Sequence, residues 1–147
     1  MSNARMKLKR VDIRNSEIQD ELSVLQKKCL PYDKPYDTNY GYWWIVYDAH
    51  NLPCSFAGLV SSVRWRDTGY LCRAGVLPSH RGHGVQKRLI RARIRQARAL
   101  GWNWLITDTY QNPISSNNLI ATGFRLFEPS KPWGADGTLY WRLNLKG

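Results

Sequence analysis

The sequence lacks the features that mark membrane, secreted and metal-binding chains. No apolar run approaches the roughly 20 residues that a bilayer-spanning helix needs, and the N-terminus has no apolar stretch typical of a signal peptide. The cysteines, Cys29, Cys54 and Cys72, are odd in number and far apart, which matches neither a disulfide framework nor a metal-ligand spacing. These absences predict a cytoplasmic protein with buried free thiols, no membrane contact and no bound metal.

Acidic residues are also scarce. Eleven Asp and Glu stand against twenty-two Lys and Arg, which gives a formal net charge of +11. Such a surface attracts nucleic acid and any ligand that carries several phosphates. Because the same charge also serves solubility alone, it does not by itself choose between these interpretations.

The composition is that of one folded domain. The chain has 147 residues, of which 43% are apolar and 12% aromatic, so it is long and apolar enough to bury one core. No linker, repeat or low-complexity tract divides it. We therefore expect a single domain over residues 1–147, with residues 1–5 disordered or left over from an expression tag.

Residue patterns predict helices and strands in an irregular order. Ser16 and Gln19 form a capping box that would begin a helix ended by Pro31. A long helix is predicted at 84–100, closed by Gly101, and a short one at 115–122. Strands are expected at 7–13, 43–47, 56–65, 70–76, 104–109, 124–127 and 138–145. Because hairpins precede the long helix, the prediction is an α/β (α+β) fold with a mixed sheet of six to seven strands flanked by helices.

The turn that leads into the long helix carries the clearest functional signal. It runs from Val76 to Val85, and its glycines let the backbone approach a ligand while the first helical turn offers free N–H groups to an anion. Arg81 and Lys87 add positive charge. The segment is neither a P-loop nor a dinucleotide fingerprint, because the residues that follow the glycines in those motifs are missing. It indicates a phosphate cradle or, more simply, a structural turn on a basic helix.

The spacing Val76-x-Pro78-x-x-Arg81-Gly82-x-Gly84-Val85 resembles motif A of the GNAT superfamily of N-acetyltransferases, particularly its small phage-encoded and bacterial members. Asn112, Ser115 and Gly123-Phe124 are similar to its motif B. The resemblance implies the GNAT fold, with a mixed sheet that is splayed at its central strands. It also implies an acyltransferase that passes the acetyl group of acetyl-CoA to a primary amine by direct attack on the thioester.

The resemblance assigns the CoA-binding residues by position. In the family the pyrophosphate lies on backbone N–H groups of the motif A turn, and the pantetheine arm pairs beside the preceding strand. The CoA-binding residues implied here are Ala74, Gly75, Val76, Arg81, Gly82, His83, Gly84, Val85, Gln86, Lys87, Asn112 and Ser115. A backbone donor at or next to Val76 is expected to polarise the acyl carbonyl.

Three positions depart from the family pattern. Gln86 replaces the last Gly or Ala of motif A, so its side chain should narrow the cradle or contact the phosphate itself. Leu119 stands where many members have a Tyr that protonates the departing thiolate, and Thr107 stands where N-terminal acetylating members have a basic Glu. Acetylation of ribosomal-protein α-amino groups is therefore disfavoured.

Catalysis can proceed without these groups, since a thioester is already activated and the main needs are positioning and a neutral amine. Asp67, Asp108 and Tyr110 lie near the expected centre as candidate bases. Asp108 follows Thr107 on a strand, so its side chain should point to the opposite face. The candidate thiolate donors are Tyr110, Ser115 and Tyr140.

Other polar and aromatic residues have weaker functional signals. His80 and His83 flank the turn, but no carboxylate or cysteine lies at ligand spacing, which favours solvent exposure or a phosphate contact. The irregular segment 31–42 holds four tyrosines, and Trp133 follows Pro132. Both could line the acceptor pocket or simply pack.

The acceptor stays open and could be a small molecule, a peptide or an aminoacyl group. The oligomeric state also stays open, between a monomer and a homodimer. Two other functions also stay open. The charge and the aromatic residues suggest a nucleic-acid- or tRNA-associated protein of this fold as an alternative. The basic stripe Lys87, Arg91, Arg95 and Arg98 is nevertheless expected to bind nucleic acid only weakly. Leu119 and Thr107 favour an inactive binding domain. Filter binding with its salt slope tests the first alternative, and acceptor screening tests the second.

Overall fold

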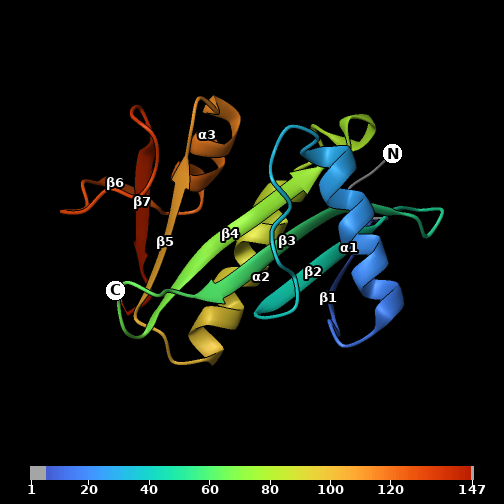
Figure 1. The fold of residues 1–147 in the computed structure, drawn as a ribbon, viewed down its shortest axis with the longest axis horizontal. Coiled ribbons are helices and arrows are strands. Elements are labelled where there is room, and N and C mark those ends of the chain that lie inside the picture. The colour runs from blue at the N-terminus through green and yellow to red at the C-terminus, as the bar shows by residue number, and fades with distance from the viewer. Residues whose placement is uncertain (1–5, 147) are drawn as a thin grey trace.

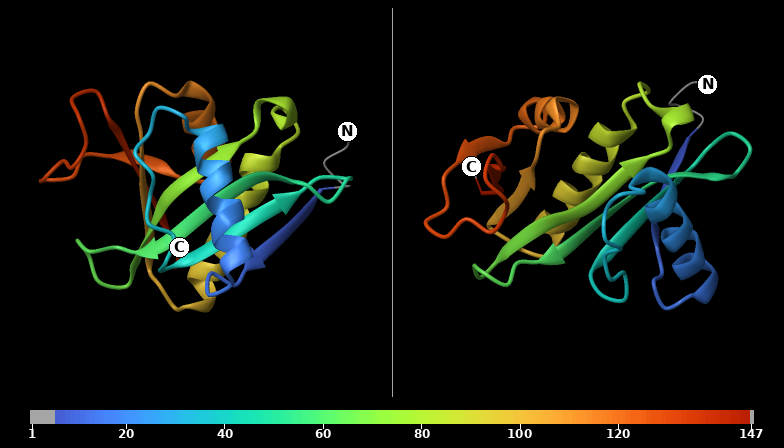
Figure 2. Two further views of the ribbon diagram at one scale, coloured as in Figure 1. Left: turned by 45° about the vertical axis from the view of Figure 1, so that its right-hand side comes forward. Right: turned by 45° about the horizontal axis from the view of Figure 1, so that its top comes forward.

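The computed structural model describes residues 6–146, and the expectation for residues 1–5 lies outside them. The helices are α1 (Ser16–Cys29), α2 (Val85–Ala99), α3 (Pro113–Ala121) and the short 3₁₀ helix η2 (Pro78–His80). The strands are β1 (Lys7–Val11), β2 (Tyr42–Tyr47), β3 (Pro53–Ser61), β4 (Thr68–Val76), β5 (Trp104–Thr109), β6 (Arg125–Phe127) and β7 (Leu139–Asn144). The strands form one mixed sheet, with α1 on one face and α2 on the other (Figures 1 and 2).

The sheet is splayed between its two parallel strands. The strand order is β1-β2-β3-β4-β5-β7-β6, and all neighbours are antiparallel except β4 and β5. These two pair only where residues 68–70 face residues 104–106, and beyond that point they separate (Figure 1). The hydroxyl of Thr107 donates to the carbonyl of Leu71 at 2.9 Å, directly after the last pair. The predicted mixed sheet with splayed central strands is confirmed.

Two apolar cores hold the helices on the sheet. Leu22, Leu25 and Cys29 of α1 are buried against Trp43 and Phe56, as the apolar spacing of the helix predicts. A second core lies under α2 on the opposite face and includes the side chains of Leu89 and Ala97. Because α1 and α2 both contact β4, their packing fixes the strand that forms one side of the splay.

The start of α1 differs from the prediction. Asn15, not Ser16, is the N-cap: its side-chain oxygen accepts from two N–H groups of the first turn at 2.8 and 3.3 Å. Gln19 does not complete a capping box but donates to the carbonyls of Ile13 and Thr38. The predicted capping box is thus wrong, and Gln19 instead ties the segment that follows α1 to the helix.

The ends of two strands also differ. β3 ends at Ser61 rather than at residue 65, because residues 62–67 form the turn to β4. β4 begins at Thr68 rather than at residue 70, because Thr68 and Gly69 pair with β5. The prediction placed these two residues in the turn, since a lone sequence does not show which strand will accept their hydrogen bonds.

The cysteines are free thiols, as expected. Cys29 and Cys54 are buried and Cys72 is half-buried, and burial raises the pKa of each thiol to about 11. Only the thiolate reacts with iodoacetamide, and at pH 8 such thiols are roughly one part in a thousand thiolate. We expect iodoacetamide to alkylate the native protein at pH 8 at least tenfold more slowly than the protein unfolded in urea. Mass spectrometry of the modified cysteines measures both rates. Equal rates in both states would contradict the shielding.

Candidate active site

Two adjoining cavities follow the splay. The turn cavity, of about 530 Å³, lies where β4 meets the turn into α2, and the splay cavity, of about 330 Å³, lies between the separated parts of β4 and β5. Their shared lining residues include Ala74, Gln86, Asn112, Ser115 and Asn118. Together they form one groove that runs from the start of α2 to the point where β4 and β5 part.

The turn cavity has the features of an anion site. Gly82 and Gly84 have φ angles of 83° and 72°, a left-handed backbone that glycine adopts without strain. Gly84 is the N-cap of α2 and contributes no side-chain cap, so the first N–H groups of the helix stay available to a ligand. Arg81 and Lys87 line the same cavity. Backbone donors, the helix dipole and two cations therefore converge there.

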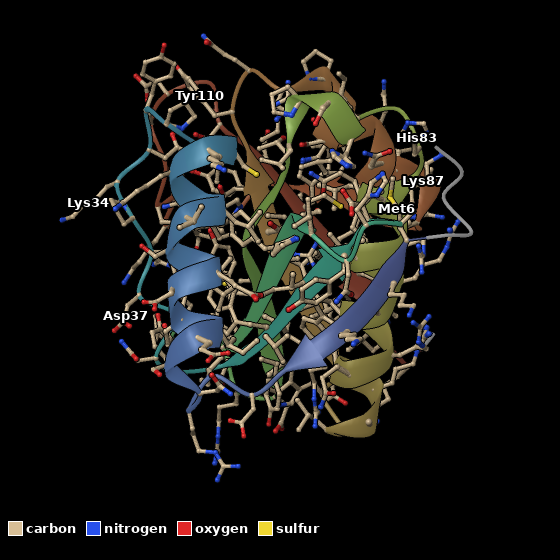
Figure 3. The ribbon with its side chains drawn as sticks, turned by 90° about the vertical axis from the view of Figure 1, so that its right-hand side faces the viewer. Met6, Lys34, Asp37, His83, Lys87 and Tyr110 are labelled. Carbon is tan, nitrogen blue, oxygen red and sulfur yellow. The ribbon has the colours of Figure 1, made fainter. Side chains whose placement is uncertain are left out.

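Nearly all the predicted CoA-binding residues meet at this cavity. Its lining includes Ala74, Gly75, Val76, Arg81, Gly82, Gly84, Val85, Gln86, Lys87, Asn112 and Ser115. His83 lines neither cavity. In Figure 3, His83 and Lys87 lie on the same side of the molecule, near Met6, whereas Tyr110 lies on the opposite side.

The structure supplies His80 with a carboxylate partner that sequence spacing did not show. Its Nε2 lies 3.0 Å from an oxygen of Asp48, and its Nδ1 lies 2.7 Å from the hydroxyl of Ser79. Backbone N–H groups of the β2–β3 turn also donate to Asp48 and hold the pKa of this carboxyl below its usual range. His80 thus ties the motif A turn to the β2–β3 hairpin while lining the turn cavity.

β4 carries a bulge beside the splay cavity. Ala57 pairs with Ala74 and Leu59 with Leu71, so two residues, Cys72 and Arg73, lie opposite Gly58. A bulge interrupts the ladder and leaves backbone groups unpaired. Val76 itself pairs with β3 and lines only the turn cavity.

Two of the three positions that depart from the family pattern, Thr107 and Leu119, line the splay cavity and have structural roles. The hydroxyl of Thr107 is used by the hydrogen bond to Leu71, and the residue is 6% exposed. Leu119 is 5% exposed and belongs to the core under α2. Neither side chain can exchange a proton with a ligand in the cavity.

Asp108 is the carboxylate at the splay. One of its oxygens accepts from the hydroxyl of Tyr70 at 2.6 Å and from the indole N–H of Trp133 at 2.9 Å, and the residue lines the splay cavity. Its side chain points away from that of Thr107, as predicted, yet it reaches the cavity because the strands part there. Burial and the Asp108 carboxylate raise the pKa of Tyr70 far above its usual range, so this phenol stays protonated and donates.

A third cavity, the aromatic cavity of about 270 Å³, adjoins Asp108 through its two donors. Tyr70 and Trp133 line it together with Tyr36 and Tyr40 from the segment after α1. Arg64 also lines it, and its guanidinium carbon lies 4.8 Å from the centre of the Trp133 ring. Asp108 thus lines the splay cavity and accepts hydrogen bonds from two residues of the mostly apolar aromatic cavity, which also includes two tyrosines of the segment 31–42.

The three candidate thiolate donors lie in different places. Tyr110 is 51% exposed at the splay cavity, and Ser115, on the first turn of α3, lines both the splay and turn cavities. Tyr140 lines neither, because its hydroxyl accepts from the N–H of Gly134 and its ring packs 4.6 Å from that of Trp133. Asp67 lies exposed in the β3–β4 turn and lines neither cavity.

Asn112 has a structural role as well as its predicted one. It is the N-cap of α3, and its side-chain oxygen accepts from the N–H of Ser115 at 3.1 Å. Its amide N–H groups remain for a ligand in the groove.

Within residues 6–146, no three His, Cys, Asp or Glu side chains gather as a metal site would require. None of the described helices combines the length and apolar character needed to cross a bilayer.

Comparisons with solved structures support the fold. A search of curated protein sequences finds no significant match. The NatC complex, solved with a Gag peptide and CoA, contains a chain that is 19% identical with a TM-score of 0.76, covering 98% of this chain and 99% of that one.

Two bacterial structures are similar. The Bacillus cereus IAA acetyltransferase is 15% identical with a TM-score of 0.73, covering 95% of this chain and 99% of that one. The yncA protein of Salmonella typhimurium, solved with its cofactor acetyl-CoA, is 18% identical with a TM-score of 0.69, covering 96% and 94%. The model of the acetyltransferase (GNAT) family matches residues 10–124, and this chain belongs to that family.

Proposed function

We propose that the protein is an acyl-CoA-dependent N-acyltransferase that transfers an acetyl group from acetyl-CoA to a primary amine. The observation that carries this proposal is the continuous groove that leads from an anion-binding turn to a carboxylate, Asp108. An inactive binding domain would need the cradle but would not need a base at the far end of the groove.

The groove fits CoA. The N–H groups at the start of α2, with Arg81 and Lys87, would hold the pyrophosphate, and the free edge of β4 near Ala74 would pair with the pantetheine arm. Gln86 lines both cavities, so its side chain would contact the arm between the phosphates and the thioester. When bound, acetyl-CoA supplies an acyl group that is already activated as a thioester.

The chain's own residues would then handle protons and charge. Asp108 accepts a proton from the incoming ammonium group, which frees the nitrogen lone pair to form the C–N bond. A backbone N–H of the Cys72–Arg73 bulge, rather than one near Val76, donates to the carbonyl oxygen as negative charge develops there. Ser115 would donate a proton to the sulfur as the C–S bond breaks. It would regain one, through solvent, from the nitrogen, which loses its second proton to become the neutral amide, and Asp108 would release its proton to solvent.

The aromatic cavity is the proposed entrance for the amine. Its walls suit an amine carried on an apolar or aromatic body, since Tyr36, Tyr40, Tyr70 and Trp133 line it and two of them hold Asp108. The surplus of positive charge on the chain disfavours polyamines.

The test combines binding with an acceptor screen. We expect calorimetry to show 1:1 binding of acetyl-CoA, and release of CoA thiol with at least one member of a panel of arylalkylamines, lysine peptides, N-terminal peptides and aminoacyl-tRNA. Mass spectrometry of the product should show one acetyl group on nitrogen. Binding of acetyl-CoA without transfer to any amine would favour the inactive binding domain, and salt-resistant tRNA binding would favour the nucleic-acid function.

A further inference from the structure

Arg93 is a buried cation in the wall of the splay cavity. It lies on α2, is 3% exposed and is the one charged residue among the buried positions of this helix. Its Nε donates to the carbonyl of Leu89 at 3.1 Å, and one Nη donates to the carbonyl of Gly58 at 3.3 Å. A guanidinium has five N–H groups, and among residues 6–146 these two carbonyls are the acceptors found for it.

No negative charge in the described residues compensates this guanidinium. Arg93 forms no ion pair there. The thiol of Cys72, which lines the same cavity, stays neutral because burial raises its pKa to about 11. Two carboxylates line the same cavity, but neither forms a hydrogen bond or ion pair with Arg93: an oxygen of Asp108 accepts from Tyr70 and Trp133, and Asp33 pairs with Arg73 at 3.1 Å. A buried cation without a counter-ion is costly, so its retention calls for an explanation.

The hydrogen bond to Gly58 does not explain why the side chain at position 93 is charged. Gly58 lies opposite the bulge, where the strand pairing is irregular, and Arg93 donates to its carbonyl. A neutral side chain with an amide donor could serve that carbonyl equally well. The remaining N–H groups and the positive charge are therefore available to a ligand in the cavity that Arg93 lines.

The cavity has room for a ligand longer than an acetyl group. Its volume of about 330 Å³ would hold roughly ten waters at ~30 Å³ each. The groove would bring the thioester from the turn cavity toward the end of the splay cavity where β4 and β5 meet at Leu71 and Thr107, and Arg93 lines the same cavity. An acyl chain that continues past the carbonyl would extend toward this end.

On this geometry, and resting on the proposed function, we infer that the preferred donor is an acyl-CoA whose chain ends in a carboxylate, which pairs with the Arg93 guanidinium. The carboxylate supplies the missing counter-ion and accepts the unused N–H groups. Charge-assisted hydrogen bonds of this kind are the strong ones in proteins. Arg93 is then the residue that selects the acyl group.

The test is a binding comparison that needs no acceptor. Calorimetry with succinyl-CoA, butyryl-CoA and acetyl-CoA should give the wild type at least a tenfold preference for succinyl-CoA over butyryl-CoA, which has the same chain length without the charge. Arg93→Gln, which keeps an amide donor, should bring this ratio to near one while leaving the affinity for acetyl-CoA within about threefold. Arg93→Lys should retain part of the preference. Arg91→Gln, an exposed position on the same helix, is the matched control and should leave the ratio unchanged.

The wild-type ratio decides the question even where Arg93→Gln does not fold. Equal binding of succinyl-CoA and butyryl-CoA by the wild type overturns the inference but leaves the proposed function standing. A succinyl preference that persists in folded Arg93→Gln also overturns it. Failure of all three thioesters to bind would overturn both the inference and the proposed function.

Discussion

Asp108→Asn is expected to lower the turnover number at least a hundredfold while changing the affinity for acetyl-CoA less than threefold. The amide has nearly the same size as the carboxylate and can still accept from Tyr70 and Trp133 through its oxygen. It cannot take a proton from an ammonium group. General base catalysis contributes about 10² to 10⁴ in rate, so the loss should appear in turnover measured by CoA thiol release with the acceptor found in the screen.

Asp67→Asn is the matched control for this variant. Asp67 was a candidate base by sequence, but it lies exposed in the β3–β4 turn with a φ of 51°, a conformation that Asn tolerates. It should retain turnover within about twofold. If Asp108→Asn keeps full turnover with the fold intact by circular dichroism, the carboxylate is not the base. Raising the pH should partly restore the rate of Asp108→Asn, because more of the amine is then already neutral.

The parts of the structure that were predicted correctly are local in sequence. The motif A turn depends on residues that follow one another, from Pro78 to Gly84, and a strand entering a glycine turn at the start of a helix builds the same cradle wherever it occurs. The long helix was predicted within one residue at each end, because its apolar spacing and Gly101 are local signals as well. The position of α3 was approximate, since Pro113 at its start was not used.

The parts that were missed depend on contacts between distant segments. Tyr70 and Asp108 are 38 residues apart, Asp108 and Trp133 are 25 apart, and Asp48 and His80 are 32 apart. Each contact follows from strand order and register, which one sequence does not determine. The sequence places Asp108 on the strand face opposite Thr107 but does not show that Asp108 lines the splay cavity, because that depends on where β4 and β5 part.

Arg93 is a case in which a signal was present and was not used. It lies four residues after Leu89 and four before Ala97, both fully buried, so helical spacing places it on the apolar face rather than in the exposed basic stripe. A charged residue at such a position is either paired or faces a cavity. The helical pattern alone could therefore have identified it as a candidate ligand-binding residue.

Gly84→Asp should weaken acetyl-CoA binding at least tenfold, which is about 1.4 kcal/mol. The carboxylate would lie at the N-cap of α2, where the proposed pyrophosphate meets the free N–H groups, and would both repel the phosphates and occupy those donors. The φ of 72° adds roughly 1–2 kcal/mol of strain for a residue with a Cβ. Affinity by calorimetry and Tm by thermal unfolding separate these two effects.

Gly101→Asp provides the control for Gly84→Asp, because the two glycines flank the same helix in the same left-handed conformation. Gly101 follows the C-terminus of α2 with a φ of 76°, and a Cβ there would meet no atom within 4 Å. Its variant should lose at least as much stability, because the strain is similar and its carboxylate lies at the negative end of the helix dipole. It should nevertheless bind acetyl-CoA like the wild type, since Gly101 lines neither the turn cavity nor the splay cavity. If Gly84→Asp binds acetyl-CoA as tightly as Gly101→Asp does, the start of α2 is not the phosphate site.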